Sequence, residues 1–566
     1  MSIKPIHHYS MENIPSIFDE EAMTALQLSG RLAAKVNEII SAFNKLDAET
    51  TAANNTQDDR LGVLENFDTW TRDTLQALFD QIAELVVTPL GYATPAMFGA
   101  LGDGVHDDTL AIQAALNALN YNVHTIIIPG GDYKVTADLI VPRGAVITGA
   151  GEYATTIRRA ANNLTNYGVF KLNNVDDVEI SKLSIYGDKD THTGTSGEWG
   201  AGIEIKSCSN VYIHDVGVYK CWGDGIYVGR IENTSSNITV ERCNIGSNRR
   251  NGVSVIACDG FRLIDSKIHH TSGTAPEAGI DFEPNTLGEK ISGAYIRGCQ
   301  FYDNNQKDVL IYDGKNLPYN HIMFTDCEFK SKVGFDYYST DLLTSATTAD
   351  NYGRVVIENS TFDNSSRCVI LTKAYKDTFV HFKGCRFNCN TICVELGGTG
   401  AKSEGGIMGG VNFTNCVVTG NGNHPVFRAI NPDGGLDAIT GELFIINTSS
   451  YAYAYTTCNS DFSKTVQLRI ANKPRIFLGS VMFTLDHYNL YSELIYETSA
   501  TACEIQLSDT FPLNFPVRLI NKGASVKVKL DNSNYWTIAN GGEATIEKTN
   551  TCWAVTGAGV TFSSIS

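Results

Sequence analysis

Apolar and polar residues alternate along most of the chain, in short runs that return at a nearly regular interval. The shared template is apolar-x-apolar-x-x-(Cys or small)-x-apolar. It reads VEISKLSI, VYIHDVGV, ITVERCNI, FRLIDSKI, AYIRGCQF, IMFTDCEF, VVIENSTF, VHFKGCRF and VNFTNCVV, beginning at residues 178, 211, 238, 261, 294, 322, 355, 380 and 411. Successive copies start 23 to 33 residues apart. A period of two is typical of β-strands that bury one face.

A second column of apolar runs falls between several copies, as GIEI, GIYV, GVSV, GIDF and DVLI at residues 202, 225, 252, 279 and 308. Each repeat therefore holds several short strands joined by turns, without a helical pattern between them. Such a unit fits one coil of a parallel β-helix, because stacked coils bury a continuous core. A β-propeller blade needs about 40 residues or more, and a β-sandwich would not keep one motif in register. We predict a mainly β protein in which residues 161–455 form a parallel β-helix.

The two ends of the chain follow other patterns. Residues 1–90 predict helices, with apolar residues three and four apart from about 18 to 47 and a heptad pattern from about 58 to 87. The heptads indicate either a coiled coil or a local helical hairpin, and the residues alone leave both open. Residues 91–160 are expected to cap the first coil. Residues 456–566 alternate as strands without the coil motif, so we expect a β-rich, β-sandwich-like domain that caps the other end.

The cysteines follow the repeat. The chain has 14 of them, with no CxxC pair and no zinc-finger spacing. Five share one slot of the template: Cys243, Cys299, Cys327, Cys385 and Cys416. This slot faces inward, where a thiol packs as a small hydrophobic group. We therefore expect stacked, reduced core cysteines rather than disulfides.

Composition and charge narrow the class of partner. The 566 residues carry a formal net charge of -18, whereas non-specific binding to nucleic acid or to an anionic membrane needs basic surfaces. No apolar run approaches the roughly 18 residues of a membrane span. The opening MSIKPIHHYSMENIPSIFDEE has no apolar segment. We therefore expect no signal peptide and a non-secretory route out of the cell, such as lysis.

Two carboxylates in the stretch GIDFE are candidates for catalysis. Ile280 and Phe282 are expected to face the core, so Asp281 and Glu283 share the outward face, with Cα atoms about 7 Å apart. Carboxyl separations of about 5 to 9 Å span both retaining and inverting glycosidases. The pair is therefore either an acid/base pair or part of an ordinary solvated strand face, and the spacing does not choose between them.

Stacking of the coils brings further polar residues beside this pair. In the second column, Asp281 is expected above Ser254, Tyr227 and Glu204, on coils about 4.8 Å apart. The adjoining turns and the next coil add five groups that would complete a lateral groove: Asp224, Arg249, Arg250, Glu277 and Asp308. Arginines bind phosphates or uronates, and aromatic rings stack on sugars. The same charges also suit solvated turns, so the groove is one of two interpretations.

Residues 92–158 carry a family resemblance. The block FGALGDGVHDDTLAIQAALNAL and the strand IIIPGGDY resemble the opening of the pectate-lyase-like β-helix superfamily, in which a helix covers the first coil. The resemblance implies a right-handed β-helix. For phage tailspikes of this type it also implies a homotrimer, with an N-terminal virion-binding part and a C-terminal β-rich trimerising part. Residues 1–90 and 456–566 are the candidates for these two parts.

Two further segments resemble a pair found together in β-helix proteins of Gram-positive bacteria and their phages, NRRNGVSV at 248–255 and TSGTAPEAGIDFEPN at 271–285. The resemblance implies a virion tailspike or appendage that binds and degrades a host surface glycopolymer, either wall teichoic acid or capsular polysaccharide. Asp281 and Glu283 would then be catalytic, and the other groove residues would bind substrate.

The reaction is left open at this point. The resemblance implies a glycoside or phosphodiester hydrolase, and a lyase also fits. No cofactor is required, and the residues leave a divalent cation open. Because the same fold serves non-catalytic proteins, a receptor-binding spike without turnover is the alternative function. A bacterial cell-surface β-helix protein is a third, which the absence of a signal segment disfavours.

Overall fold

The computed structural model describes most of the chain from residue 91 onward. The described residues are 91–121, 124–286, 289–313, 319–339, 354–372, 379–388, 392–397, 408–419, 427–430, 436–445, 454–456, 467–471, 476–477, 483–485, 493–496, 503–507, 517–521, 525–530, 534–548 and 553–564. The predicted helices of residues 1–90 lie outside them. Among the described residues, no helix combines the length and the apolar character needed to cross a membrane.

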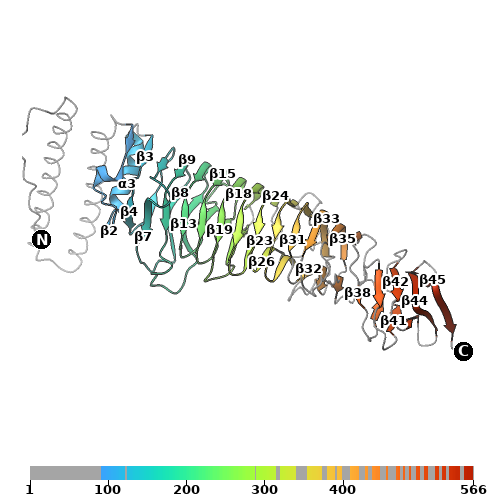
Figure 1. Ribbon diagram of the computed structural model, residues 1–566. Coiled ribbons are helices and arrows are strands. Elements are labelled where there is room, and N and C mark those ends of the chain that lie inside the picture. The colour runs from blue at the N-terminus through green and yellow to red at the C-terminus, as the bar shows by residue number, and fades with distance from the viewer. Residues whose placement is uncertain are drawn as a thin grey trace, which may run out of the picture. The chain divides into compact units, whose positions relative to one another are not determined.

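The described residues fall into two compact units, and the first contains residues up to 159 together with 177–184. It combines a short helix with parallel strands (Figure 1). Its elements are β1 (Tyr92–Ala93), η3 (Pro95–Phe98), β2 (Asp103–Asp107), α3 (Thr109–Asn117), η4 (Ala118–Tyr121), β3 (Thr125–Ile127), β4 (Gly131–Val135), β5 (Leu139–Ile140), β6 (Val146–Thr148), β7 (Thr155–Arg159) and most of β9 (Asp176–Ser181). Helix α3 buries Ile112, Ala115 and Leu116, so the chain has a helix where the resemblance implied one.

The second unit contains residues 160–176 and 185–566. Its coils each add a strand to long parallel ladders (Figure 1). One ladder consists of the strands of the second sequence column, and we call it the groove sheet. It contains β8 (Asn166–Asn173), β11 (Trp199–Lys206), β14 (Ile226–Gly229), β17 (Val253–Val255), β20 (Ala278–Phe282), β23 (Lys307–Asp313), β26 (Val333–Ser339), β29 (Arg367–Thr372), β32 (Ile392–Gly397), β34 (Phe427–Ile430) and β36 (Ala454–Thr456). The predicted parallel β-helix is confirmed.

The template copies form the other strands of the coils, which we call the template sheet. The longer ones are β12 (Ser209–His214), β15 (Ser235–Glu241), β18 (Cys258–Ile264), β21 (Ile291–Arg297), β24 (Tyr319–Thr325), β27 (Arg354–Glu358), β30 (Phe379–Lys383), β33 (Met408–Thr419), β35 (Leu436–Ile445) and β37 (Gln467–Ala471). The shorter ones are β10 (Ser184–Tyr186), β13 (Gly217–Tyr219), β16 (Asn244–Gly246), β19 (Lys267–His269), β22 (Gln300–Tyr302), β25 (Glu328–Phe329), β28 (Thr361–Phe362) and β31 (Arg386–Asn388). Val211 pairs with Ile238, and Ile238 pairs with Phe261, so successive template copies lie in register.

Phenylalanines fill much of the space inside the coils. Phe301, Phe329 and Phe362 form a stack with ring centroids 5.4 and 4.6 Å apart. Phe282 of the groove sheet meets Phe324 of the template sheet edge to face at 6.3 Å. All five side chains are fully buried. The sheets therefore share one core, which holds the outward residues of the groove sheet in fixed register.

The template cysteines are buried thiols, as the sequence predicts. Cys299, Cys327, Cys385 and Cys416 are at most 1% exposed and form no disulfide. Each Sγ donates to a backbone carbonyl of the preceding coil. The slot therefore suits cysteine because it needs a small apolar side chain that can also reach a carbonyl.

The glycines of the second column stand where neighbouring coils approach closely. A Cβ at Gly202 would lie 2.8 Å from the carbonyl oxygen of Gly225, and one at Gly225 would lie 2.6 Å from that of Gly252. The same contact recurs from Gly252 to Gly279 at 2.6 Å. Any side chain at these positions would separate the coils, which explains why glycine begins the runs GIEI, GIYV and GVSV of this column.

The C-terminal strands differ from the predicted sandwich-like cap. They are β38 (Ile476–Phe477), β39 (Phe483–Leu485), β40 (Glu493–Tyr496), β41 (Cys503–Leu507), β42 (Val517–Asn521), β43 (Val526–Lys529), β44 (Asn534–Lys548) and β45 (Trp553–Ser564). Strands β38, β40 and β42 pair in parallel, as do β39, β41 and β43. The long β44 then joins both ladders antiparallel and pairs with β45. Sandwich strands are antiparallel throughout, and strand alternation alone does not distinguish the two arrangements.

Candidate functional site

The outward side of the groove sheet carries the predicted column of polar residues. Glu204 pairs with Tyr227, Tyr227 with Ser254, and Ser254 with Asp281. The predicted stacking order is therefore confirmed. The core contacts of Ile280 and Phe282 on the other face of β20 hold Asp281 in this column.

Arg250 lies at the centre of four carboxylates. Its Nη2 is 3.0 Å from Glu283 Oε2 and 4.0 Å from Asp281 Oδ2, and its Nη1 is 3.3 Å from Asp224 Oδ2. Its Nε is 3.5 Å from Glu198 Oε2. Burial opposes the charge on Arg250, but Asp224, Asp281 and Glu283 outweigh it and raise the pKa of the guanidinium. Arg250 therefore stays cationic and is fully engaged by the protein's own acids.

Asp281 is more enclosed than the strand pattern predicts. Its side chain is 0% exposed, because residues of the adjoining turn and coils cover it. Oδ2 accepts a hydrogen bond from Asn251 Nδ2 at 3.0 Å, whereas Oδ1 has no partner. Burial, followed by the nearby charge of Glu283, raises the pKa of Asp281 well above its usual value. The side chain points outward as expected, but it forms the sealed floor of the site rather than an open groove wall.

Asp224 and Glu283 experience different environments beside the same arginine. Burial raises the pKa of Asp224, and its attraction to Arg250 offsets this only in part. The Glu283 side chain is 22% exposed and pairs closely with Arg250. Acid/base chemistry needs one carboxyl group that gives a proton and one that accepts it, and unlike environments favour such a division.

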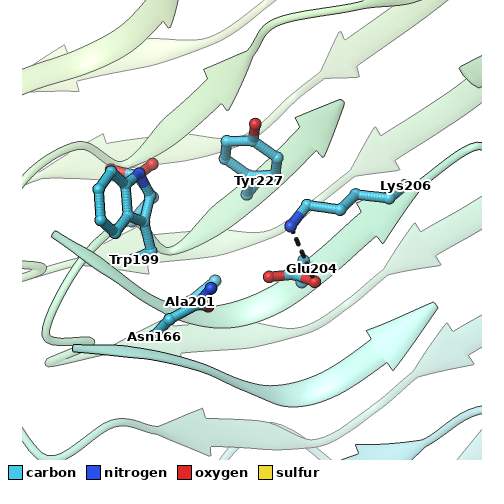
Figure 2. A pocket seen from close by; sticks show the side chains of 7 residues that line it. Asn166, Trp199, Ala201, Glu204, Lys206 and Tyr227 are labelled. Carbon is cyan, nitrogen blue, oxygen red and sulfur yellow. Dashed lines mark ion pairs between the residues drawn. The ribbon is translucent and has the colours of Figure 1, made fainter. Parts of the chain in front are cut away.

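A pocket of about 320 Å³ opens on the groove sheet beside this cluster (Figure 2). Its lining comes from β8, β11, β14 and the turn before β14: Asn166, Trp199, Ala201, Glu204, Lys206, Asp224 and Tyr227. Asp224 belongs to both the pocket and the Arg250 cluster. The predicted residues Glu204, Asp224 and Tyr227 are thus brought together at one cavity.

The pocket combines an exposed indole with an ion pair. Trp199 is 57% exposed, which is unusual for so large an apolar side chain. Lys206 Nζ lies 3.2 Å from Glu204 Oε1 and 5.3 Å from the centroid of the Tyr227 ring. In Figure 2 the Lys206 side chain reaches along the strand to Glu204, and the rings of Trp199 and Tyr227 face the same space. Lys206 and Glu204 thus place an ion pair inside the pocket.

Besides Ala201, three pocket residues were missed by the sequence analysis. Lys206 lies two residues after Glu204 on β11, so the alternation that selected Glu204 would also have found it. Trp199 opens the same strand, just before GIEI, but nothing in the repeat marks an aromatic residue there. Asn166 begins β8, whose strand lacks the GI motif, so no pattern pointed to it.

Arg249 does not present its charge to the pocket, contrary to the expectation. Its guanidinium lies on the face of Trp222, 3.8 Å from the ring centroid, and its Nη1 donates to Gly197 O at 2.8 Å and Trp222 O at 3.3 Å. Gly197 belongs to the loop 187–198, which leads directly into Trp199. Arg249 therefore fastens this loop instead of binding an anion.

The other face of Trp222 is covered by His192 from the same loop. The two rings stack with centroids 3.8 Å apart, and His192 Nδ1 is 2.8 Å from Asp188 Oδ2. Asp188 also accepts hydrogen bonds from the hydroxyl of Tyr167 and from Asn162. The loop is thus anchored at both ends, and it holds Trp199 at the mouth of the pocket.

Two more predicted groove residues are used inside the fold. Glu277 accepts hydrogen bonds from Gly273 N–H at 2.6 Å and from Asn305 Nδ2 at 2.5 Å. Asp308 is 0% exposed and accepts from Ser331 N–H and Asn304 Nδ2 at 2.9 and 3.1 Å. Glu277 lies in the turn before β20, where the alternation that assigns faces no longer applies, whereas Asp308 is the second residue of β23 and is covered by Asn304 and Ser331 of the turns. The expectation that these two carboxylates line the groove is therefore corrected.

The surroundings of these two carboxyl groups shift their pKa values in opposite directions. Burial favours the neutral form of Glu277, but the bonds from Gly273 and Asn305 outweigh it and lower its pKa. Burial raises the pKa of Asp308 to about 7. In the described part of the chain, no group of three or more His, Cys, Asp or Glu side chains has the geometry to hold a metal ion.

Comparison with known proteins finds similarity over parts of the chain. Residues 96–188 match the family described as rhamnogalacturonase A/epimerase, pectate lyase-like, and residues 288–442 match the right-handed β-helix region. The chain is also similar to the crystal structure of the N-terminal fragment of bacteriophage phi29 gene product 12. That likeness covers 78% of this chain and 74% of the fragment at 15% identity, with a TM-score of 0.52. The chain therefore shares the right-handed β-helix fold with this phage protein.

Sequence relatives of this β-helix protein come from bacteria and phages. It is 31% identical over 256 residues to the uncharacterized protein YclG of Bacillus subtilis (strain 168), covering 39% of this chain. It is 24% identical over 316 residues to the pre-neck appendage protein of Bacillus phage phi29, covering 50% of this chain. It is 29% identical over 195 residues to the capsule K30/K69-specific depolymerase of Klebsiella phage K64-1, covering 32% of this chain. The matches span 44%, 36% and 22% of these relatives, less than half of each.

Proposed function

We propose that this β-helix protein is a phage appendage that binds a host cell-surface glycopolymer and hydrolyses it at the pocket on the groove sheet. The observation that carries the proposal is the pocket itself. It sets two carboxylates in unlike environments, Asp224 and Glu204, beside an exposed Trp199. A sugar ring can stack on the indole while its glycosidic bond meets both carboxyl groups. The names of the phage relatives, an appendage protein and a capsule depolymerase, support the same function.

The two pocket carboxylates can divide the work of glycoside hydrolysis. Asp224, whose pKa burial raises, gives its proton to the glycosidic oxygen as the bond from that oxygen to the anomeric carbon breaks. Glu204, paired with Lys206, acts as the carboxylate. It either removes a proton from the attacking water or attacks the anomeric carbon before water releases the sugar. In both cases one water is consumed. Its hydroxyl ends on the anomeric carbon of one product, and the oxygen of the other product gains a proton.

Asp281 and Glu283, the pair selected from the sequence, are the second candidate pair. They also lie in unlike environments around Arg250, with Asp281 buried and Glu283 partly exposed. Asp281 is sealed from solvent, however, whereas Asp224 and Glu204 line the cavity. We propose that Asp281 and Glu283 mainly hold Arg250, which in turn holds Asp224 in position.

Variants of each pair separate these assignments. With purified host surface polymer as substrate, Asp224→Asn and Glu204→Gln are expected to lower kcat by about 10²- to 10⁴-fold, because each removes a proton transfer. Binding of the same polymer should persist. Asp281→Asn is expected to lower kcat much less. If Asp281→Asn abolishes turnover while Asp224→Asn does not, the assignment of Asp224 and Glu204 as the catalytic pair is wrong.

The pH profile gives a second check on Asp224. A general acid works only while it holds its proton, so kcat should fall as the pH rises through the raised pKa of Asp224. This alkaline limb should vanish in the residual activity of Asp224→Asn and survive in Asp281→Asn. Binding by the wild-type protein without any turnover would instead identify a non-catalytic receptor-binding spike.

We also propose that the chain forms a homotrimer and attaches to the virion through residues 1–90. The resemblance to phage tailspikes supports both statements, and the similarity to a pre-neck appendage protein supports the virion location. Sedimentation equilibrium of the full chain tests the first, with a mass three times that of the chain expected. A monomer would contradict it.

A further inference from the structure

We infer that the pocket takes a sugar residue without negative charge, an uncharged or amino sugar that stacks on Trp199, and rejects uronates and phosphate-bearing sugars. This inference rests on the proposed function and narrows its substrate class. It also reverses the role expected for the two arginines, which the sequence suggested as anion-binding groups.

The first step is that neither arginine lines the pocket. Arg249 lies over the ring of Trp222, and its Nη1 donates to Gly197 O and Trp222 O. Arg250 is within 3.5 Å of Glu198, Asp224 and Glu283, and its side chain is only 12% exposed. A phosphate or carboxylate that reached Arg250 would have to displace a carboxylate already bound there.

The second step is that the cation lining the pocket is also engaged. Lys206 is the cationic residue among the lining residues, and its Nζ lies 3.2 Å from Glu204 Oε1. Binding an anion at Lys206 would leave Glu204, itself 5% exposed, without its partner in a largely desolvated site. The loss of that ion pair would offset most of the attraction to the ligand.

The third step is the sum of charges. The lining itself carries two carboxyl groups, Glu204 and Asp224, and one cation, Lys206. Even if the buried Asp224 keeps its proton, the charge of Lys206 is matched by Glu204. The lining therefore has no positive charge left over for an anionic sugar.

The lining that remains suits a sugar without negative charge. Trp199 offers a large exposed aromatic face, and Tyr227 offers a second ring. Aromatic faces bind the apolar C–H side of a sugar ring, and their electron-rich centres favour a nearby cation. Glu198, which precedes Trp199 and is 49% exposed, could pair with an ammonium group. An amino sugar should therefore bind at least as well as a neutral one.

The inference has a consequence for the reaction class. Elimination by a lyase requires a uronate, whose carboxyl group makes the neighbouring C–H acidic enough to lose its proton. A pocket that rejects uronates cannot supply such a substrate. The inference therefore favours hydrolysis, with a free reducing end on one product and no new double bond on the other.

Titration calorimetry of the full-length protein with matched disaccharides tests the inference. The probes are N,N'-diacetylchitobiose (neutral), chitobiose (amino sugar) and digalacturonate (anionic), each measured with EDTA and with calcium. The amino and neutral probes are expected to bind at least about tenfold more tightly than the uronate, since like charges within one site repel. Equal or tighter binding of the uronate, with or without calcium, would overturn the inference.

Two variants guard against a misleading result. Trp199→Ala should weaken the neutral probe by about tenfold, because the stacking face is lost, and an unchanged affinity would place the sugar elsewhere. Glu198→Lys should strengthen the uronate relative to the neutral probe, and no change in that ratio would overturn the charge argument. If none of the probes binds, the inference fails. Cleavage of the intact host polymer would then show that the proposed function stands without it.

Discussion

Arg250 determines the character of the acids around it. Because its charge is shared among Asp224, Asp281 and Glu283, burial outweighs the attraction to Arg250 at the two buried carboxyl groups, and the pKa values of Asp224 and Asp281 are raised. The strand alternation predicts which of these residues face outward. It does not predict that Arg250 and Asn251, from the preceding turn, cover Asp281. Burial at this site is a property of the turns, which the period-two pattern does not describe.

Arg249 gives a prediction at the residue scale. Arg249→Lys removes the planar group that lies on Trp222 and donates to Gly197 O, and a lysine replaces neither interaction well. The loop that carries Trp199 should then lose its fixed position. We expect KM to rise about tenfold with kcat changed less than about twofold, because substrate positioning is lost and the carboxylates are not.

Arg242→Lys is the matched control for this variant. Arg242 pairs with Asp215 on the template sheet, away from the pocket, so the same substitution should leave KM and kcat unchanged. An equal rise of KM in both variants would mean that an arginine-to-lysine change raises KM wherever it is made, and not through the loop that carries Trp199. A loss of kcat in Arg249→Lys without a change of KM would contradict the positioning role.

Asp308 gives a prediction for stability. Burial raises its pKa to about 7 in the folded protein, from an ordinary value of 3.8. The folded state therefore holds the proton more tightly than the unfolded state between these values, and rising pH removes stability across that range. The free energy of unfolding of the wild type minus that of Asp308→Asn should fall from about pH 4 to about pH 7 and level off above.

Denaturant unfolding at a series of pH values measures this difference. The comparison with Asp308→Asn cancels the contribution of the other carboxylates, many of which act in the opposite direction. A difference that stays constant, or that increases with pH, would show that Asp308 is not held neutral by burial.

At the scale of the strands, the glycines of the second column control how closely the coils stack. Gly252→Ala would place a Cβ 2.6 Å from Gly279 O and 2.3 Å from Ile268 Cγ2. The coils must then separate on the side that carries Ser254 and Asp281. We expect a loss of about 1–3 kcal/mol in the free energy of unfolding, the usual cost of overpacking.

Gly130→Ala provides the comparison for this prediction. Gly130 is exposed, and the atom nearest to a Cβ added there would be Ala154 O at 3.4 Å. The free energy of unfolding of Gly130→Ala should therefore differ from that of the wild type by less than about 0.5 kcal/mol. Denaturant titration of both variants gives the two values. Similar stabilities for Gly252→Ala and Gly130→Ala would argue against the close coil contact.

The elements themselves could largely be predicted, because each coil repeats the same apolar spacing. The template copies lie in register, and the column from Glu204 to Asp281 stacks in the expected order. The loop 187–198 could not be predicted, because it has no period and its position depends on contacts between His192, Trp222 and Arg249. The C-terminal ladders could not be distinguished from a sandwich, because both arrangements alternate in the same way.

At the scale of the whole molecule, ion pairs recur along the outward side of the groove sheet. Beyond Lys206 and Arg250, Lys307 Nζ lies 2.6 Å from Asp336 Oδ2, and Arg367 Nε lies 3.0 Å from Glu395 Oε2. Each of these four cations is thus matched by a carboxylate of its own strand or of a nearby coil. With a net charge of -18, the protein has little to attract a polyanion along this face, in keeping with a substrate residue that carries no negative charge.

The most direct test of the central claim is product analysis after incubation with host surface polymer. Mass spectrometry should find shorter chains that end in a free reducing sugar. For each bond cleaved, the summed mass of the two fragments should exceed that of the parent chain by one water. Asp224→Asn should bind the polymer and release no such products. Intact polymer after prolonged incubation with wild-type protein that demonstrably binds it would contradict the claim that this pocket is a hydrolytic site.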